Sequence, residues 1–221
     1  MMRLPLFPLE LILFPGALVP LHIFEPRYRA LLADCLAGER RFGILPPGVD
    51  GAPPATGSIG TIAEIRGTQP LPDGRSNVVV EGEERFMVRR FLDEGTPYLL
   101  ALVDPFDDDP EEDEAGDSEV ASLRALADRL DGAERILTGS GHQGTWAADA
   151  GGLTFQVAAL LDVEATFKQR FLGIRSARHR LALLLQFLPG IVAGLEARAV
   201  VMVRAATNGH GGAKPDLMIE T

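Results

Sequence analysis

Short apolar runs broken by prolines open the chain. The runs cover residues 4–9, 12–14 and 19–24. The prolines in and between them are Pro5, Pro8, Pro15 and Pro20. Because proline cannot donate a hydrogen bond to a sheet ladder, each one belongs at a strand edge, a bulge or a turn. The pattern therefore predicts short strands near the edge of a sheet.

A second series of strand signals covers residues 59–103. Alternation of side-chain type predicts one sheet face that carries Ile59, Thr61, Ala63 and Ile65. Further strands are expected near residues 77–81, 85–92 and 98–103, with a turn at residues 72–74 and glycine breaks at Gly82 and Gly95. Consecutive short strands joined by turns are typical of a meander or a small barrel.

One amphipathic helix is predicted within this part of the chain. Pro26 suits the first helical position, and Gly38 suits the residue after the last turn. Between them, apolar side chains recur at helical spacing and form one stripe of Tyr28, Leu31, Leu32, Cys35 and Leu36. We expect the helix to lie across the barrel, with Arg27, Arg29 and Asp34 facing outward.

The pattern after residue 118 is helical. Ser118 is a candidate N-cap, and apolar residues follow at helical spacing from Val120 to Leu137. Shorter helices are expected over residues 153–161 and 165–172. A glycine-rich loop over residues 139–152 separates them from the preceding helix.

A long helix is predicted near the end of the chain. Ser176 is expected to cap it, and a leucine-rich stretch follows. Pro189-Gly190 is expected to kink or break the helix before it continues over residues 191–205. The polar, glycine-rich residues 207–221 are predicted to form a flexible tail.

The negative charge of the chain is concentrated in one strip. The sequence has 31 acidic and 21 basic residues, and ten of the acidic ones lie between Asp104 and Glu119, a stretch without any basic residue. Blocks of like charge repel themselves and stay solvated. Residues 107–117 are therefore predicted to be a mobile acidic linker. A calcium loop is the alternative, but the spacing lacks the D-x-[DN]-x-[DN]-G pattern.

Metal and redox chemistry have little support in the sequence. Cys35 is the sole cysteine, which excludes an internal disulfide, and its place on the apolar stripe favours a buried hydrophobic role over a reactive thiol. The four histidines form no H-x-x-x-H or H-E-x-x-H pair. We expect neither a metal site nor a cofactor.

No membrane segment is expected either. No uninterrupted apolar run approaches the roughly 20 residues that a membrane-spanning helix needs. The opening apolar segment lacks the basic region and the cleavage site of a signal peptide. The expected location is therefore cytoplasmic.

The ordered set of these segments resembles the amino-terminal domain of Lon-type ATP-dependent proteases. Residues 4–9, 14–16 and 20–28 carry the first part of the resemblance. Residues 59–65, 71–75 and 80–86 continue it in the same order, and residues 168–172 with Arg178 and Arg180 resemble the helical part of that domain. The resemblance covers roughly residues 3 to 200.

The resemblance implies an α+β fold, in which a PUA-like β-barrel with one helix is followed by a helical bundle. The expected organisation is a barrel subdomain at residues 1–106, the acidic linker at 107–117, a helical subdomain at 118–206 and the tail at 207–221. In full-length Lon proteases this module recognises substrate polypeptide and assists assembly, and small stand-alone proteins with this domain alone are known. The resemblance implies such a stand-alone role here.

The catalytic motifs of Lon proteases are absent from this sequence. There is no G-x-x-x-x-G-K-[ST] loop, and the glycine-rich residues 139–145 lack the lysine that contacts phosphate groups. Lys168 and Lys214 are the only lysines, and no serine stands in the family's proteolytic motif. We therefore expect no enzymatic activity.

An adaptor that docks on full-length Lon is one alternative. Another is an enzyme or small-molecule binder of unrecognised type, for which His22, Glu25 and arginines would have to converge in a pocket.

Unfolded or degron-bearing polypeptide is the expected partner, bound without ATP hydrolysis. Nucleic acid is not expected, because the barrel half has arginine pairs and no basic stripe. An extended polypeptide could add to an exposed strand edge or lie on its apolar side chains. The candidate contact residues are Phe7, Leu9, Phe14, Phe24 and Tyr28. Core packing is the alternative for each aromatic residue, and the sequence favours it for any one of them.

Overall fold

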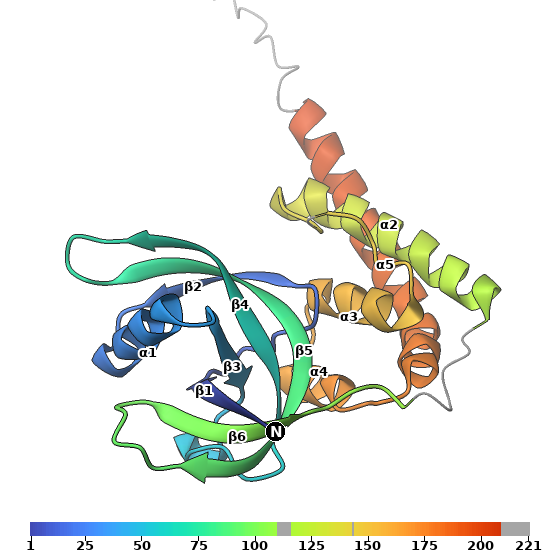
Figure 1. Cartoon of the computed structure of the whole chain (residues 1–221). Helices are drawn as coiled ribbons and strands as arrows, with labels where there is room; N and C mark the ends of the chain where they lie inside the picture. Colours follow the sequence, from blue (N-terminus) through green and yellow to red (C-terminus); the bar gives the residue numbers. More distant parts are fainter. Residues whose placement is uncertain (110–115, 143, 209–221) are drawn as a thin grey trace, which may run out of the picture.

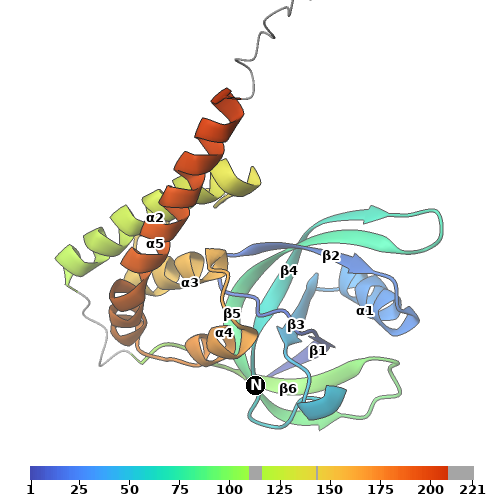
Figure 2. The ribbon, with the colours of Figure 1, turned by 180° about the vertical axis from the view of Figure 1, so that it is seen from behind.

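The computed structural model of the protein describes residues 1–109, 116–142 and 144–208. A barrel half (residues 1–109) and a helical half (residues 116–208) lie side by side (Figures 1 and 2). The predicted tail falls almost entirely outside the described residues. The mixed α+β class expected from the sequence is confirmed.

Six strands, one α-helix and a short 3-10 helix (Val49–Gly51) make the barrel half. The strands are β1 (Met2–Pro8), β2 (Leu18–Ile23), β3 (Arg41–Leu45), β4 (Ile59–Pro70), β5 (Ser76–Leu92) and β6 (Leu99–Pro105). The sheet order is β2-β5-β4-β3-β1-β6, and β5 also pairs with β6. That pairing closes a ring of five strands and leaves β2 outside it. The pairing of β1 with β3 is parallel, and the other pairings are antiparallel.

The helix α1 (Pro26–Ala37) is confirmed in detail. It begins at Pro26, and the predicted stripe is buried in the barrel core except for Leu36, which is exposed. Gly38 follows the last turn, and its N–H donates to the carbonyl of Cys35. The stripe packs because residues three and four apart share one face of a helix.

Strand β3 is the element that the sequence pattern misses. It has five residues, four of them buried, with no polar alternation to mark it. Strand β4 is buried on both faces, which the expected single face of Ile59, Thr61, Ala63 and Ile65 does not include. Ala63 and Ile65 pack in one barrel cluster, and Ile62, on the opposite face of the strand, packs in another.

Gly82 lies within β5 and does not end a strand, contrary to the sequence expectation. Its backbone faces the loop after β1, and its N–H donates to the carbonyl of Ala17. A Cβ at this position would lie 2.2 Å from the carbonyl oxygen of Phe14. Glycine is therefore required at this position because two backbones approach each other closely. It does not mark the end of a strand.

Four helices make the helical half. They are α2 (Asp117–Thr138), α3 (Ala150–Leu160), α4 (Ala165–Leu172) and α5 (Ala177–Asn208). Helices α2 and α5 lie side by side, and α3 and α4 lie between them and the barrel (Figures 1 and 2). Ser176 accepts a hydrogen bond from the N–H of His179, as its predicted capping role requires. Helix α2 begins with Gly116 as the N-cap residue in place of Ser118.

Helix α5 continues through Pro189, so the predicted break does not occur. Pro189 lies on the exposed side of the helix, where water can bond the carbonyl that lacks a donor. The stretch Ala177–Ala205 is long and apolar enough to span a membrane, although charged residues interrupt it and no membrane segment was expected from the sequence. One such helix is weak evidence for a membrane span, because core helices meet the same criterion, and Leu181, Leu184 and Leu188 are core residues of the helical half.

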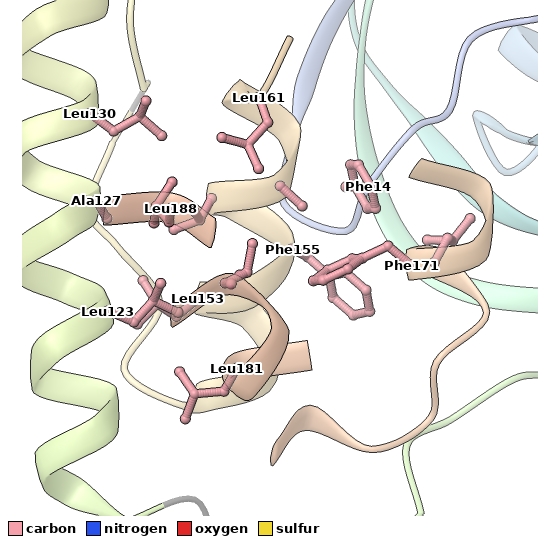
Figure 3. Packing of buried hydrophobic residues seen from close by; sticks show 14 of the residues in the cluster. Phe14, Leu123, Ala127, Leu130, Leu153, Phe155, Leu161, Phe171, Leu181 and Leu188 are labelled. Atoms are coloured by element: carbon pink, nitrogen blue, oxygen red, sulfur yellow. The ribbon is translucent and has the colours of Figure 1, made fainter. Parts of the chain in front are cut away.

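Phe14 joins the two halves through apolar packing. It comes from the loop after β1 and enters the core of the helical half, between α3 and α4 (Figure 3). Its ring centroid lies 5.9 Å from that of Phe155 and 6.1 Å from that of Phe171. Three aromatic rings from three segments thus form one buried contact across the junction.

A buried ion cluster joins the same halves through polar contacts. Arg85 of β5 and Arg180 of α5 are 5% and 0% exposed, and both bind the carboxylate of Asp108. The Arg180 guanidinium is bidentate, at 2.8 and 2.6 Å from the two carboxylate oxygens. Arg85 also donates to the carbonyls of Leu172 and Ile174, at 2.7 and 2.9 Å. The start of the predicted mobile linker is therefore held in place.

The cluster provides a first test of what holds the halves together. We expect Asp108→Ala to lower the free energy of unfolding by about 3 kcal/mol, because it leaves two buried guanidiniums without a counter-charge. The neighbouring Asp109 forms an exposed ion pair with Arg175. Asp109→Ala should therefore cost less than about 1 kcal/mol. Urea unfolding measures both, and equal losses would contradict the structural role of Asp108.

A second test concerns the close approach at Gly82. We expect Gly82→Ala to lower the free energy of unfolding by about 2 kcal/mol or more, because the new methyl group meets a backbone carbonyl that cannot rotate away. Gly67 of β4 is the matched control, since a Cβ there meets no atom within 4 Å. Gly67→Ala should change stability by less than about 1 kcal/mol. Thermal unfolding that ranks the two variants equally would refute the argument.

Candidate functional site

Strand β2 presents a free backbone edge. Among the described strands it pairs only with β5, in the register Val19↔Val80 and Leu21↔Val78. In an antiparallel pair, alternate residues exchange both backbone hydrogen bonds with their partner. The bond from the Gly82 N–H to the Ala17 carbonyl sets the phase, so Ala17 and the alternate residues after it are the ones that bond β5.

The remaining β2 residues point their backbone groups away from the sheet. These residues are Leu18, Pro20 and His22. The N–H groups of Leu18 and His22 face the free edge, and Pro20 offers only a carbonyl there. An incoming strand could thus form hydrogen bonds with β2 at both ends of this segment. At its centre β2 has no N–H to donate, because that residue is Pro20.

Apolar side chains cover the outer face beside this edge. Leu18 and Val79 are 44% and 42% exposed, and Pro20 is exposed directly opposite Val79. Phe24 follows the strand and is 58% exposed. Leu18, Pro20, Val79 and Phe24, with the free backbone edge, are called the β2 surface below. Exposed aromatic and aliphatic groups beside unpaired backbone are the two features of strand-addition sites.

Polar residues along the rim of the β2 surface bond to one another. His22 Nδ1 lies 2.8 Å from the side-chain oxygen of Asn77, and its ring stacks near Phe24 with centroids 6.0 Å apart. Glu25 instead forms an exposed ion pair with Arg27. Arg75 Nη1 lies 3.4 Å from His22 Nε2, but neither His22 nor Glu25 lines any of the cavities described below, as an enzymatic site built from them would require.

The structure separates the five residues predicted to contact polypeptide. Phe7, Phe14 and Tyr28 are buried, and the Phe7 and Tyr28 rings pack with centroids 3.9 Å apart. They are core residues because their side chains face the barrel interior or the junction. Leu9 is half-buried and lies outside the β2 surface, whereas Phe24 is part of it.

Three members of the β2 surface were not among the predicted contact residues. Alternation along residues 18–23 is the signal that would have found Leu18 and Pro20, because their neighbours Val19, Leu21 and Ile23 face the core. Val79 lies within a run of three valines, where the sequence cannot tell the inner from the outer face. Its place follows only from the pairing of β5 with β2.

A second apolar surface lies at the far end of the helical half. A groove of about 730 Å³ runs between α2 and α5, lined by Ile136, Ala199, Val200 and Val203 among others. Val201 and Met202, on the same turn of α5, are also exposed. Continuous apolar exposure around a helix is unusual for a surface facing water alone.

A third hollow, of about 570 Å³, lies beside Cys35, Asp34 and Tyr98 in the barrel half. The Tyr98 hydroxyl donates to Asp34 at 2.6 Å. Burial raises the pKa of the Cys35 thiol to about 12, and the charge of Asp34 adds to the shift. A thiol with such a pKa is a poor nucleophile.

Among the described residues, no group of three histidine, cysteine, aspartate or glutamate side chains is placed to hold a metal ion.

The architecture is thus a small closed barrel with an exposed apolar edge strand, joined to a helical bundle. The chain belongs to the family of ATP-dependent protease La (LON) substrate-binding domains, whose family profile matches residues 3–189. Among curated proteins it is similar to the Lon protease of Brucella suis, with 26% identity over 194 residues that cover 85% of this chain and 24% of the relative. The Lon protease of Rhizobium meliloti is 28% identical over 200 residues, which cover 87% of this chain and 24% of the relative. The chain thus spans about a quarter of the length of these relatives.

Solved structures agree with this assignment. The crystal structure of a Lon N-terminal domain protein from Xanthomonas campestris superposes with a TM-score of 0.63 at 27% identity, over 85% of this chain and 99% of that one. The N-terminal domain of the Mycobacterium avium complex Lon protease shares the fold, with a TM-score of 0.62 at 20% identity over 85% of this chain and 98% of the other. The matched region is the substrate-binding domain of Lon, not its ATPase or protease domain.

The thiol offers a test of the barrel core. At pH 8 we expect Cys35 in the folded protein to react with an aromatic disulfide reagent at least about 100-fold more slowly than in the urea-unfolded chain, because burial suppresses the thiolate. Absorbance of the released thiolate measures both rates. Similar rates in the two states would show that the thiol is accessible and ionised.

Proposed function

We propose that this chain binds unfolded or degron-bearing polypeptide segments at the β2 surface. Membership of the LON substrate-binding family supports a role in substrate recognition. The free edge of β2 beside Leu18, Val79 and Phe24 is the single observation that carries the choice of surface. Backbone groups at the edge would bond to any sequence, while the apolar side chains would favour segments exposed by unfolding.

The proposed role is binding without catalysis by this chain. The sequence contains neither the phosphate-binding loop of an ATPase nor the serine motif of a Lon protease. Lys168, one of its two lysines, lines a cavity whose described lining residues include no serine. ATP hydrolysis and peptide-bond cleavage would accordingly belong to other domains.

A second candidate function is docking on full-length Lon as an adaptor or assembly factor. The observation that favours it is the apolar groove between α2 and α5, which lies on the helical half, away from the β2 surface (Figures 1 and 2). A folded partner could cover this groove while the β2 surface stays open. Co-purification with Lon protease that Val200→Asp abolishes and Phe24→Asp leaves unchanged would support this function.

Polypeptide binding is tested on the exposed residues of the β2 surface. We expect Phe24→Asp and Val79→Asp each to weaken binding of a labelled, permanently unfolded protein at least about tenfold, because each places a charge in an apolar contact. Val49 is 85% exposed and lies outside the β2 surface, so Val49→Asp is the matched control and should bind normally. Fluorescence anisotropy measures the affinities after circular dichroism has shown that each variant folds.

The proposal fails if the unfolded protein does not bind at tens of micromolar. It also fails if the three variants bind as the natural protein does, since binding would then occur elsewhere. Equal weakening by all three variants would indicate charge repulsion in place of a defined surface.

A further inference from the structure

A small polar cavity adjoins the start of β2. Its volume is about 170 Å³, below the roughly 300 to 1,000 Å³ of pockets for drug-sized ligands. One wall is the loop before β2 with Leu18 itself, and the others come from α3, α4 and the segment at Gly141–His142. The cavity is therefore large enough for the end of one side chain or one chain terminus, and it is continuous with the β2 surface.

The polar groups that line this cavity favour a negative ligand. Lys168, Gln156 and His142 are its polar side chains, and none of the residues that line it is acidic. The Gln156 side-chain oxygen accepts from the N–H of Ala147 at 2.7 Å, so its amide group remains as a donor. No acidic side chain in the cavity lining pairs with the Lys168 charge or accepts from these donors.

Lys168 is a half-buried cation without a direct partner. Its ammonium group makes no ion pair or side-chain hydrogen bond with any residue in the described part of the chain, and its backbone N–H donates to the carbonyl of Glu164, the N-cap residue of α4. Burial lowers the pKa of its ammonium group, and the charge of Asp162 opposes the shift. A bound carboxylate would pair with the ammonium group and replace the stabilisation by water that burial removes.

His142 supplies an independent observation. Its Nε2 atom is buried and has no hydrogen-bond partner among the described residues. The ring is fixed by stacking on Trp146, with centroids 3.9 Å apart and planes 6° apart. Buried polar atoms are nearly always satisfied in folded proteins, so an orphan in a cavity wall calls for a ligand or a water molecule.

We infer that this cavity binds the terminal carboxylate of a polypeptide that lies along the β2 edge. The inference rests on the proposed function. A strand that pairs antiparallel to β2 runs from the Ile23 end toward Leu18, so its C-terminus arrives at the cavity. Lys168 forms the ion pair, and the Gln156 amide and His142 Nε2 donate hydrogen bonds to the carboxylate. The ligand class is therefore a chain that ends in an apolar, extended segment with a free carboxyl group.

The test compares two forms of one apolar peptide of about ten residues, one with a free C-terminal carboxylate and one with a C-terminal amide. We expect the acid to bind the natural protein about tenfold more tightly than the amide, which corresponds to one charge-assisted hydrogen-bonded contact. Lys168→Met should remove this preference by weakening the acid alone, and Lys168→Arg should retain part of it. Fluorescence anisotropy with labelled peptides gives all the affinities.

Arg170 provides the matched control. It lies two residues further along α4, is exposed and does not line the cavity. Arg170→Gln removes the same charge and should leave the acid preference unchanged, whereas an equal loss in both variants would show a general electrostatic effect and overturn the inference. The comparison of acid and amide on the natural protein decides the matter even if Lys168→Met fails to fold.

The remaining outcomes separate this inference from the proposed function. Equal binding of acid and amide overturns the carboxylate site and leaves polypeptide recognition at the β2 surface intact. An amidated peptide with an internal glutamate that binds as tightly as the acid would assign the cavity to a side-chain carboxylate and overturn the terminal assignment. Binding of neither form, together with no binding of unfolded protein, overturns both proposals.

Discussion

The contact of Arg85 and Arg180 with Asp108 is the interaction on which the arrangement of the two halves depends. Asp108 lies at the end of the barrel half, and its carboxylate binds guanidiniums from β5 and from α5. Arg85 also bonds two carbonyls in the turn between α4 and α5, and the Phe155 ring lies 5.0 Å and 4.0 Å from the two guanidinium carbons. Such a cluster favours one arrangement of the barrel half and the helical half, because each charge is costly to bury without the others. Phe14 adds apolar packing at the same junction.

The same junction shapes both proposed ligand sites. Strand β5 is long enough to pair with β4 along most of its length, with β2 near its start and with β6 near its end. Closing the ring with β6 leaves β2 outside, where its edge is open. Natural edge strands carry features that discourage unwanted pairing, and Pro20 is such a feature, because it removes one donor from the middle of the edge. The cavity with Lys168 exists only because α3 and α4 are held against the loop that leads into β2.

The sequence predicts elements with a regular period and misses what depends on contacts between distant segments. Helix α1 is foreseen because Pro26, Gly38 and the apolar spacing between them coincide. Strand β3 is missed because a five-residue buried strand has no alternation. The acidic strip is predicted to be mobile from its charge alone. No local sequence pattern indicates that Asp108 binds two arginines 23 and 72 residues away. Of the predicted contact residues, Phe24 lies on the β2 surface, while Phe7, Phe14 and Tyr28 are core, since exposure is decided by which strands pair.

Residue-resolved amide hydrogen exchange, with and without a saturating unfolded polypeptide, tests the central claim most directly. If a polypeptide adds to the edge of β2, the N–H groups of Leu18 and His22 become protected when it binds, because they are the outward donors of that strand. The N–H groups of Val19 and Leu21, which already bond β5, should change little. Protection that appears only around Val200 to Val203 of α5, with Leu18 and His22 unchanged, would contradict the account and move the binding surface to the helical half.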